Sequence, residues 1–173
     1  MASRNFPMQT IANQNHNNSD LFPAFTMRTF SMILIAGLSA DIAWEVWARV
    51  FTPLIPTVGG PLEPAALVQS VFGLESRLVG EVIHFVVGVV FYPVGYLYIA
   101  RPIQRLLLPG LPWPVTALGF GAGLFVFALY VMAHLIAGFP PFLGWVPLSW
   151  CSLVGHLMFG LIVGIVVQVQ ERR

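Results

Sequence analysis

Residues 78–100 read LVGEVIHFVVGVVFYPVGYLYIA, an apolar run interrupted by one acidic side chain and one imidazole. A helix rises ~1.5 Å per residue and needs about 20 mostly apolar residues to cross the hydrocarbon core of a bilayer, so this run is long enough. Three other runs share its length and character. The sequence therefore predicts four membrane-spanning helices, at residues 29–51, 78–100, 114–139 and 147–170.

The composition of the 173-residue chain supports a membrane protein. It is 57% hydrophobic and 9% charged, whereas a soluble domain carries about 25% charged residues. We therefore expect an all-α integral membrane protein whose single domain, residues 29–173, is a four-helix bundle in contact with the lipid bilayer. Residues 1–28 are polar and rich in Asn and Gln, which favours a disordered tail. The net charge of +1 indicates no nucleic-acid partner.

Arginines are distributed unevenly over the expected connections, and this predicts the topology. Cytoplasmic loops of membrane proteins are enriched in Lys and Arg. With an even number of spans, both termini and the connection after residue 100 fall on the arginine-rich side, which we assign to the cytoplasm. The first and third connections then lie outside, and residues 65–72 of the first are compatible with a short interfacial helix. The arginines on the cytoplasmic side are Arg4, Arg28, Arg101, Arg105, Arg172 and Arg173.

Ionisable side chains recur in all four apolar segments. Each costs ~2.5–3.5 kcal/mol in hydrocarbon on insertion scales, so such residues are candidates for function. A rise of 1.5 Å per residue places all of them ~6–15 Å from the outer ends of their helices. We therefore expect a polar site in the outer half of the bundle, formed by Asp41, Glu45, Glu81, His84, His134 and His156.

Helical spacing indicates which of these side chains share a face. Asp41 and Glu45 are four residues apart, and Glu81 and His84 are three apart. His156 lies on one stripe with Gly160 and Gly164, and small residues mark close helix approaches in membranes. We therefore expect the imidazoles to point into the bundle and the glycine pair to pack inside it.

Two further residues in the same region bear on the site. Trp44 stands beside Glu45 and is expected to line the polar cluster. Pro93 lies inside the second segment and predicts a kink that opens a cavity, because proline removes a helical hydrogen bond. Cys151 is the only cysteine, which excludes an internal disulfide.

Several kinds of chemistry are compatible with this set of residues. Three imidazoles with carboxylates suit zinc, iron or copper. Two imidazoles on facing helices would suit haem, although nearby carboxylates make that arrangement less natural. A proton-responsive network is a further alternative. In a purely structural alternative, Glu45 pairs with Arg49, Glu81 pairs with Arg77, and the imidazoles hold the helices in register.

The sequence leaves the reaction and the partners open. It contains no constellation of nucleophile and base that would define an enzyme. The leading hypothesis is a metal-binding or proton-responsive site. An accessory subunit of a larger membrane complex is the alternative, and a homo-oligomer is compatible with either.

Short motifs in a fixed order resemble one known family. They are Leu34-Ile35-Ala36-Gly37-Leu38 with Trp44-Glu45-Val46, His84 with Val89-Val90-Phe91 and Gly95-Tyr96, His134 with Gly138 and Pro140-Pro141, and Gly155-His156-Leu157. Together, over residues 33–173, they resemble the YagU-type family of bacterial inner-membrane proteins. The resemblance implies a small multi-span protein of the bacterial inner membrane, in a family without an established biochemical activity. It matches most clearly at Glu45, His84 and His156.

Overall fold

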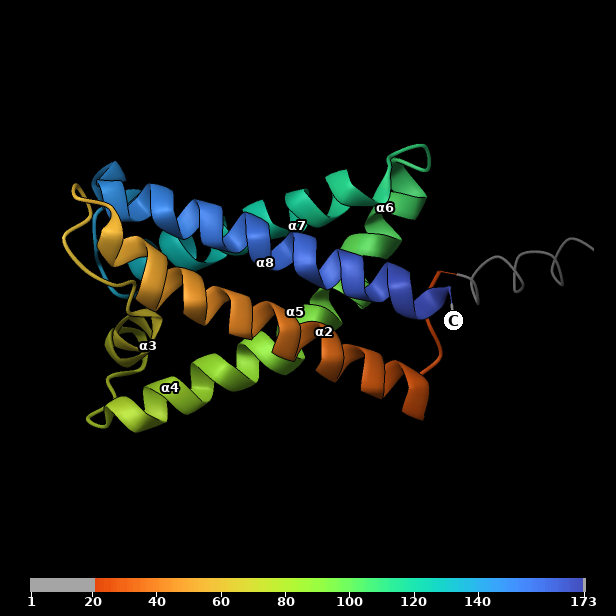
Figure 1. Ribbon diagram of the computed structural model, residues 1–173, viewed down its shortest axis with the longest axis horizontal. Coiled ribbons are helices and arrows are strands. Elements are labelled where there is room, and N and C mark those ends of the chain that lie inside the picture. Colours follow the sequence, from red (N-terminus) through yellow and green to blue (C-terminus); the bar gives the residue numbers. More distant parts are fainter. Residues whose placement is uncertain (1–20, 173) are drawn as a thin grey trace, which may run out of the picture.

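The computed structural model describes residues 21–172, and within that range the chain is built of helices without strands (Figure 1). Most of the expected polar tail, residues 1–20, lies outside the described residues. Four helices are long and apolar enough to cross a membrane, which confirms the all-α prediction and the count of candidate spans. We call them spans 1 to 4: Met27–Leu54, Arg77–Leu107, Trp113–Ile136 and Pro147–Glu171.

Span 1 combines a long α-helix with one wider π turn and one tighter 3₁₀ turn. It consists of α2 (Met27–Val46), the π-helix η1 (Trp47–Phe51) and the 3₁₀ turn η2 (Thr52–Leu54). Thr26 caps α2, since its Oγ1 accepts a hydrogen bond of 3.2 Å from the Thr29 backbone N–H. The short helix expected in the first connection is present as α3 (Pro64–Phe72). It starts with a proline and ends at Gly73, whose φ of 62° suits a helix C-terminus.

Span 2 contains π turns that accompany its prolines. Its elements are α4 (Arg77–Val86), η3 (Val87–Phe91), α5 (Tyr92–Gly95), η4 (Tyr96–Ala100) and α6 (Arg101–Leu107). Pro93 and Pro102 lack the N–H that would continue the regular pattern, and a wider turn precedes each of them. The predicted end of this helix at residue 100 is therefore wrong, because η4 accommodates Pro102 and the helix continues to Leu107.

Spans 3 and 4 form the closest helix pair. Span 3 comprises α7 (Trp113–Val126) and η5 (Phe127–Ile136), and span 4 is α8 (Pro147–Glu171). A Cβ atom added to Gly121 would lie 2.3 Å from the His156 carbonyl oxygen, and one on Gly160 would lie 2.4 Å from that of Ala117. These two helices approach so closely that only glycine fits. The expectation that Gly160 packs inside the bundle is confirmed.

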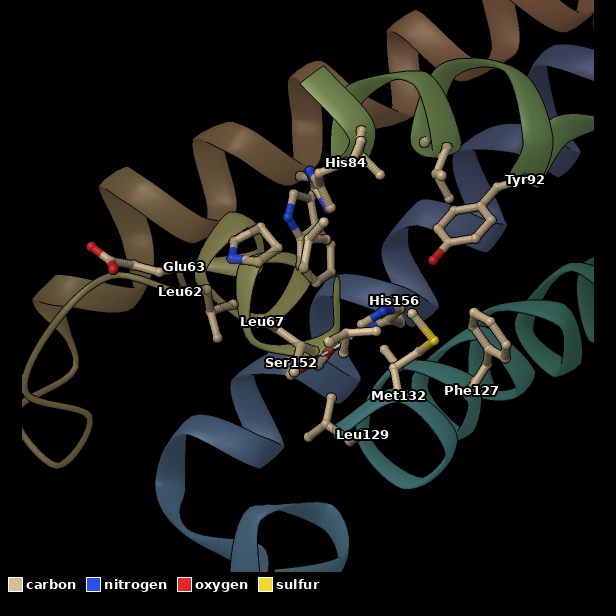
Figure 2. Close-up of a pocket in the computed structure, with 18 of the residues that line it drawn as sticks. Leu62, Glu63, Leu67, His84, Tyr92, Phe127, Leu129, Met132, Ser152 and His156 are labelled. Atoms are coloured by element: carbon tan, nitrogen blue, oxygen red, sulfur yellow. Dashed lines mark hydrogen bonds between the residues drawn. The ribbon is translucent and has the colours of Figure 1, made fainter. Parts of the chain in front are cut away.

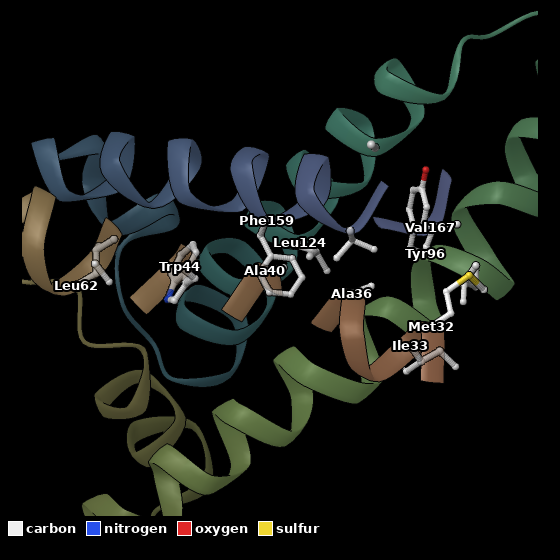
Figure 3. Close-up of a cluster of buried hydrophobic side chains, with 14 of the residues drawn as sticks. Met32, Ile33, Ala36, Ala40, Trp44, Leu62, Tyr96, Leu124, Phe159 and Val167 are labelled. Atoms are coloured by element: carbon white, nitrogen blue, oxygen red, sulfur yellow. The ribbon is translucent and has the colours of Figure 1, made fainter. Parts of the chain in front are cut away.

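Arg28 and Arg101 meet the last turn of span 4 at one end of the molecule, whereas Arg49 and Arg77 lie at the other end. Arg28 at the start of span 1 donates a 2.7 Å hydrogen bond to the Gln170 carbonyl at the end of span 4. Arg101 of span 2 forms a two-point ion pair with Glu171, also at that end. We call this the arginine end, and the opposite end, where α3 lies, the α3 end (Figure 1). Between them, side chains of all four spans form a buried core, with Ile33, Tyr96 and Val167 among its members (Figure 3).

Spans 2 and 3 diverge toward the α3 end. Among the described elements they pack on each other mainly near their connection, where η4 contacts α7. At the other end α3 packs on α4 and also contacts η5, so it bridges the two spans. A Cβ atom on Gly80 would lie 2.8 Å from the Ala65 carbonyl oxygen, which shows how tightly α3 sits on α4. The divergence leaves a space beneath α3.

Candidate functional site: a cavity beneath α3

The space between spans 2 and 3 is a cavity of ≈ 430 Å³. Its walls come from α2, α3, span 2, η5 and α8, and most of them are apolar (Figure 2). The α3 residues that line the cavity recur every three or four positions, so one face of this short helix covers the cavity. The α3 residues that line it are Pro64, Leu67, Val68, Val71 and Phe72.

Three of the predicted site residues line this cavity. Asp41 from α2, His84 from α4 and His156 from α8 all line it, and Figure 2 shows both imidazoles directed inward. Trp44 lies between the imidazoles: its ring centroid is 6.4 Å from that of His84 and 4.6 Å from that of His156. The expectation that Trp44 lines the cluster is confirmed.

Asp41 has an unusual environment for a carboxylate. It is only 6% exposed, and within the described residues it makes no hydrogen bond and no ion pair. Its Oδ1 lies 2.8 Å from the position of a Cβ atom added to Gly88, so the absent side chain of Gly88 provides the space for the carboxylate. The glycine thereby allows an acidic group of span 1 to reach span 2 and the cavity.

His156 is held in one tautomer by its own helix. Its Nδ1 lies 2.7 Å from the Ser152 carbonyl oxygen and 3.3 Å from the Ser152 hydroxyl. A carbonyl oxygen only accepts hydrogen bonds, so Nδ1 carries the proton, and Nε2 of the neutral ring is a hydrogen-bond acceptor. This nitrogen can accept a proton or bind a metal.

Trp44 is fixed by a close approach of span 1 to span 4. A Cβ atom on Gly155 would lie 2.4 Å from the Trp44 ring, so the indole occupies the space that a larger residue would fill. Its Nε1 is buried without a hydrogen-bond partner among the described residues.

Glu45 and Glu81 belong to a separate chain of ion pairs. Arg49 pairs with Glu45 one turn before it and, at 3.2 Å, with Glu81 of span 2. Arg77 pairs with Glu81 at 3.6 Å and with Glu63 at 3.5 Å. The expected ion pairs of Glu45 with Arg49 and of Glu81 with Arg77 are confirmed, and they join spans 1 and 2 and the start of α3. Neither Glu45 nor Glu81 lines the cavity.

His134 lies apart from both groups. Its Nδ1 is 2.7 Å from the Phe139 carbonyl oxygen, and its ring centroid is 5.4 Å from that of Tyr130. It does not line the cavity, so the structure divides the six predicted metal ligands among three places. Within the described range no group of three His, Cys, Asp or Glu side chains could hold a metal ion. A metal centre therefore stays a prediction.

The structure also adds residues that the sequence analysis did not select. Tyr92, Glu63 and Ser152 line the cavity together with the apolar face of α3. Two signals could have indicated them: the spacing of Ser152 and His156 by one helical turn, and the repeat of apolar residues in α3.

A left-handed turn borders the cavity between spans 3 and 4. In η6 (Pro141–Trp145) the residues Phe142, Leu143 and Trp145 have φ values of 50°, 54° and 56°. For a residue other than glycine, this left-handed backbone conformation is unfavourable by ~1–2 kcal/mol. The Phe142 ring stacks on Trp145 at 4.7 Å, and the Ser149 hydroxyl donates a 2.7 Å hydrogen bond to the Phe142 carbonyl. These contacts hold Leu143 against the cavity.

Comparison with protein families, with curated proteins and with solved structures returns no match. The resemblance to the YagU-type family accordingly stays a prediction. The geometry of the cavity is the basis on which we assign a function.

Proposed function

We propose that this chain is an integral protein of the bacterial inner membrane that binds a small, largely apolar molecule in the cavity beneath α3. Four helices of sufficient length and hydropathy support membrane insertion. The arginine end is the cytoplasmic end in this proposal, because loops on that side of a membrane are enriched in basic residues. The cavity then lies in the outer half of the bilayer. The bacterial location rests on the family resemblance alone.

The composition of the cavity wall carries the proposal. Pockets that bind small molecules usually enclose ~300–1,000 Å³ and combine apolar walls with a few polar groups. The cavity of ≈ 430 Å³ falls in this range, and its few polar residues include Asp41, His84 and His156. The apolar part of a ligand would contact α3 and η5. Its polar part would meet an acceptor on Asp41 or His156.

The divergence of spans 2 and 3 suggests how a ligand enters. Phe91 and Phe127 line the cavity, yet both are exposed on the outside of the bundle, Phe91 to 61%. In a membrane these side chains would face lipid. An apolar molecule dissolved in the bilayer would therefore reach the cavity sideways, between the two spans and below α3, without crossing water.

Quenching of Trp44 fluorescence tests this function. Replacing Trp47, Trp113, Trp145 and Trp150 by Phe leaves Trp44 as the single fluorophore. In lipid nanodiscs, 1-bromonaphthalene should then quench Trp44 along a saturable curve, because a bound heavy atom would lie next to the indole.

Cavity-filling variants provide the matched comparison. Ala128→Phe adds a ring to the cavity wall and should abolish the saturable component, whereas Val126→Phe, on the exposed side of the same helix, should preserve it. Quenching that rises linearly and equally in all three proteins would contradict the proposal.

Metal or proton binding in the same cavity is a second candidate. It is favoured by the fixed tautomer of His156, which leaves Nε2 as an acceptor on the cavity wall that His84 and Asp41 also line. Elemental analysis of purified protein would then find zinc, iron or copper, and a visible spectrum would identify haem. His84→Ala and His156→Ala should each remove the metal, whereas His134→Ala should not. Metal loss in His134→Ala would contradict the division of the six residues.

A further inference from the structure

We infer that the cavity selects hydrophobic organic cations over neutral and anionic molecules of the same shape, an inference that rests on the proposed binding function. Three observations support it independently: a carboxylate without a partner, aromatic walls around it, and an excess of acidic side chains at the α3 end.

Asp41 supplies the counter-charge. A buried carboxylate is costly unless it is paired or hydrogen-bonded, and within the described residues Asp41 has neither kind of partner. Its carboxylate stands in the space left by Gly88, at a point where the cavity wall is formed by both spans. A positively charged ligand would provide the missing partner. A neutral ligand would leave the charge uncompensated, and an anionic ligand would be repelled.

Aromatic side chains surround the same region. Trp44, Tyr92, Phe127 and Phe159 line the cavity, and the Tyr92 and Phe159 rings meet edge to face at 5.7 Å. The faces of aromatic rings attract cations, most strongly when water is excluded. Such walls accept the apolar substituents of an organic cation and its charge together. A small hydrated metal ion would gain nothing from them.

The charge balance of the α3 end points the same way. Arg49 and Arg77 are each shared between two glutamates, and Glu63 of this chain of ion pairs also lines the cavity. Glu75 adds a further negative charge in the loop before α4. Glu45, Glu63, Glu75 and Glu81 therefore outnumber the two arginines at the α3 end. The resulting negative potential attracts cations and raises their local concentration.

His84 and His156 do not oppose this selection while their rings are neutral. The His156 Nδ1–H donates to the Ser152 carbonyl, so the other ring nitrogen, Nε2, is the one that can accept a hydrogen bond. A protonated amine can donate to such a nitrogen as well as to Asp41. The polar part of the cavity wall thus contains more acceptors than donors.

Three probes of similar shape and different charge test the inference. They are tetraphenylphosphonium, neutral triphenylphosphine oxide and anionic tetraphenylborate. Binding is measured by equilibrium dialysis against the full chain in nanodiscs, with empty nanodiscs subtracted. Wild-type protein should bind the cation about tenfold or more tightly than the neutral probe, as expected for a charge interaction in a desolvated site.

Two variants identify the residue responsible. Asp41→Asn should lose the preference for the cation while still binding the neutral probe, which also shows that the variant is folded. Glu75→Gln removes the same charge from the same end but does not line the cavity, and it should lower the preference much less than Asp41→Asn does. Equal binding of cation and neutral probe to wild type, or an unchanged preference in Asp41→Asn, would overturn the cation inference alone. Wild-type protein that binds none of the three would overturn the proposed function itself.

Discussion

Gly121→Ala should destabilise the protein and disturb the site at once. The added Cβ would lie 2.3 Å from the His156 carbonyl oxygen and 2.9 Å from the Leu157 Cα. An ordinary contact between carbon and a carbonyl oxygen is ~3.3 Å or more, so α7 and α8 must separate by about 1 Å. Both atoms are backbone, so no side-chain rotation relieves the clash.

The expected magnitude is the difference between two opposing terms. Overpacking of a tight interface costs ~1–3 kcal/mol. Replacing glycine by alanine inside a helix returns ~0.5–1 kcal/mol of conformational entropy. We therefore expect the free energy of unfolding to fall by about 1–2 kcal/mol. Because His156 lies against Trp44, the emission of Trp44 should shift as well.

Two glycines on the same helix are matched controls. A Cβ atom on Gly119 or Gly123 would meet nothing within 4 Å. Alanine at either position should leave the protein unchanged or slightly more stable. Thermal unfolding in detergent, followed by far-ultraviolet circular dichroism, compares the three variants. If Gly121→Ala unfolds at the same temperature as Gly123→Ala, the close approach of spans 3 and 4 is refuted.

Arg49→Leu should lower the free energy of unfolding by about 1 kcal/mol, since each of its two pairs is worth ~0.2–1 kcal/mol at a partly exposed site, and its side chain is 52% exposed. In the Arg49→Leu protein, Glu45→Leu should lower the free energy of unfolding by less than it does in the wild type. Losses that add fully in a denaturant titration would argue against the ion pair. In reporter fusions, Gly59 and Phe142 should prove external and a junction after Arg105 internal. A cytoplasmic Gly59 would reverse the proposed orientation.

Much of this architecture could be predicted from patterns along the chain. A sequence records local spacing, and three features depend on it. They are the number of apolar segments, the arginines near the ends of spans 1, 2 and 4, and the pairs of Glu45 with Arg49 and of Glu81 with Arg77. The approach of Gly160 to span 3 follows from the small size of the residue. These features need no knowledge of how the helices rotate about their axes.

The composition of the site could not be predicted in the same way. Depth places Glu81 and His84 at a similar level, but only the rotation of α4 decides that His84 lines the cavity while Glu81 meets Arg49. His134 shows the same limit, because its ring binds the Phe139 carbonyl of the following turn. The role of α3 depends on the divergence of two spans, a tertiary feature that no local pattern encodes.

Photolabelling with an alkyl diazirine tests the central claim, that the space beneath α3 binds an apolar molecule. The full chain is labelled in nanodiscs with and without excess 1-bromonaphthalene, and the modified residues are mapped by mass spectrometry. Leu67 and Met132 line the cavity, whereas Ile42 and Val82 are exposed outside it. We predict that the competitor removes the labels from Leu67 and Met132 and leaves those on Ile42 and Val82. Labels that the competitor affects equally at all four residues, or no label on Leu67 and Met132, would contradict the account.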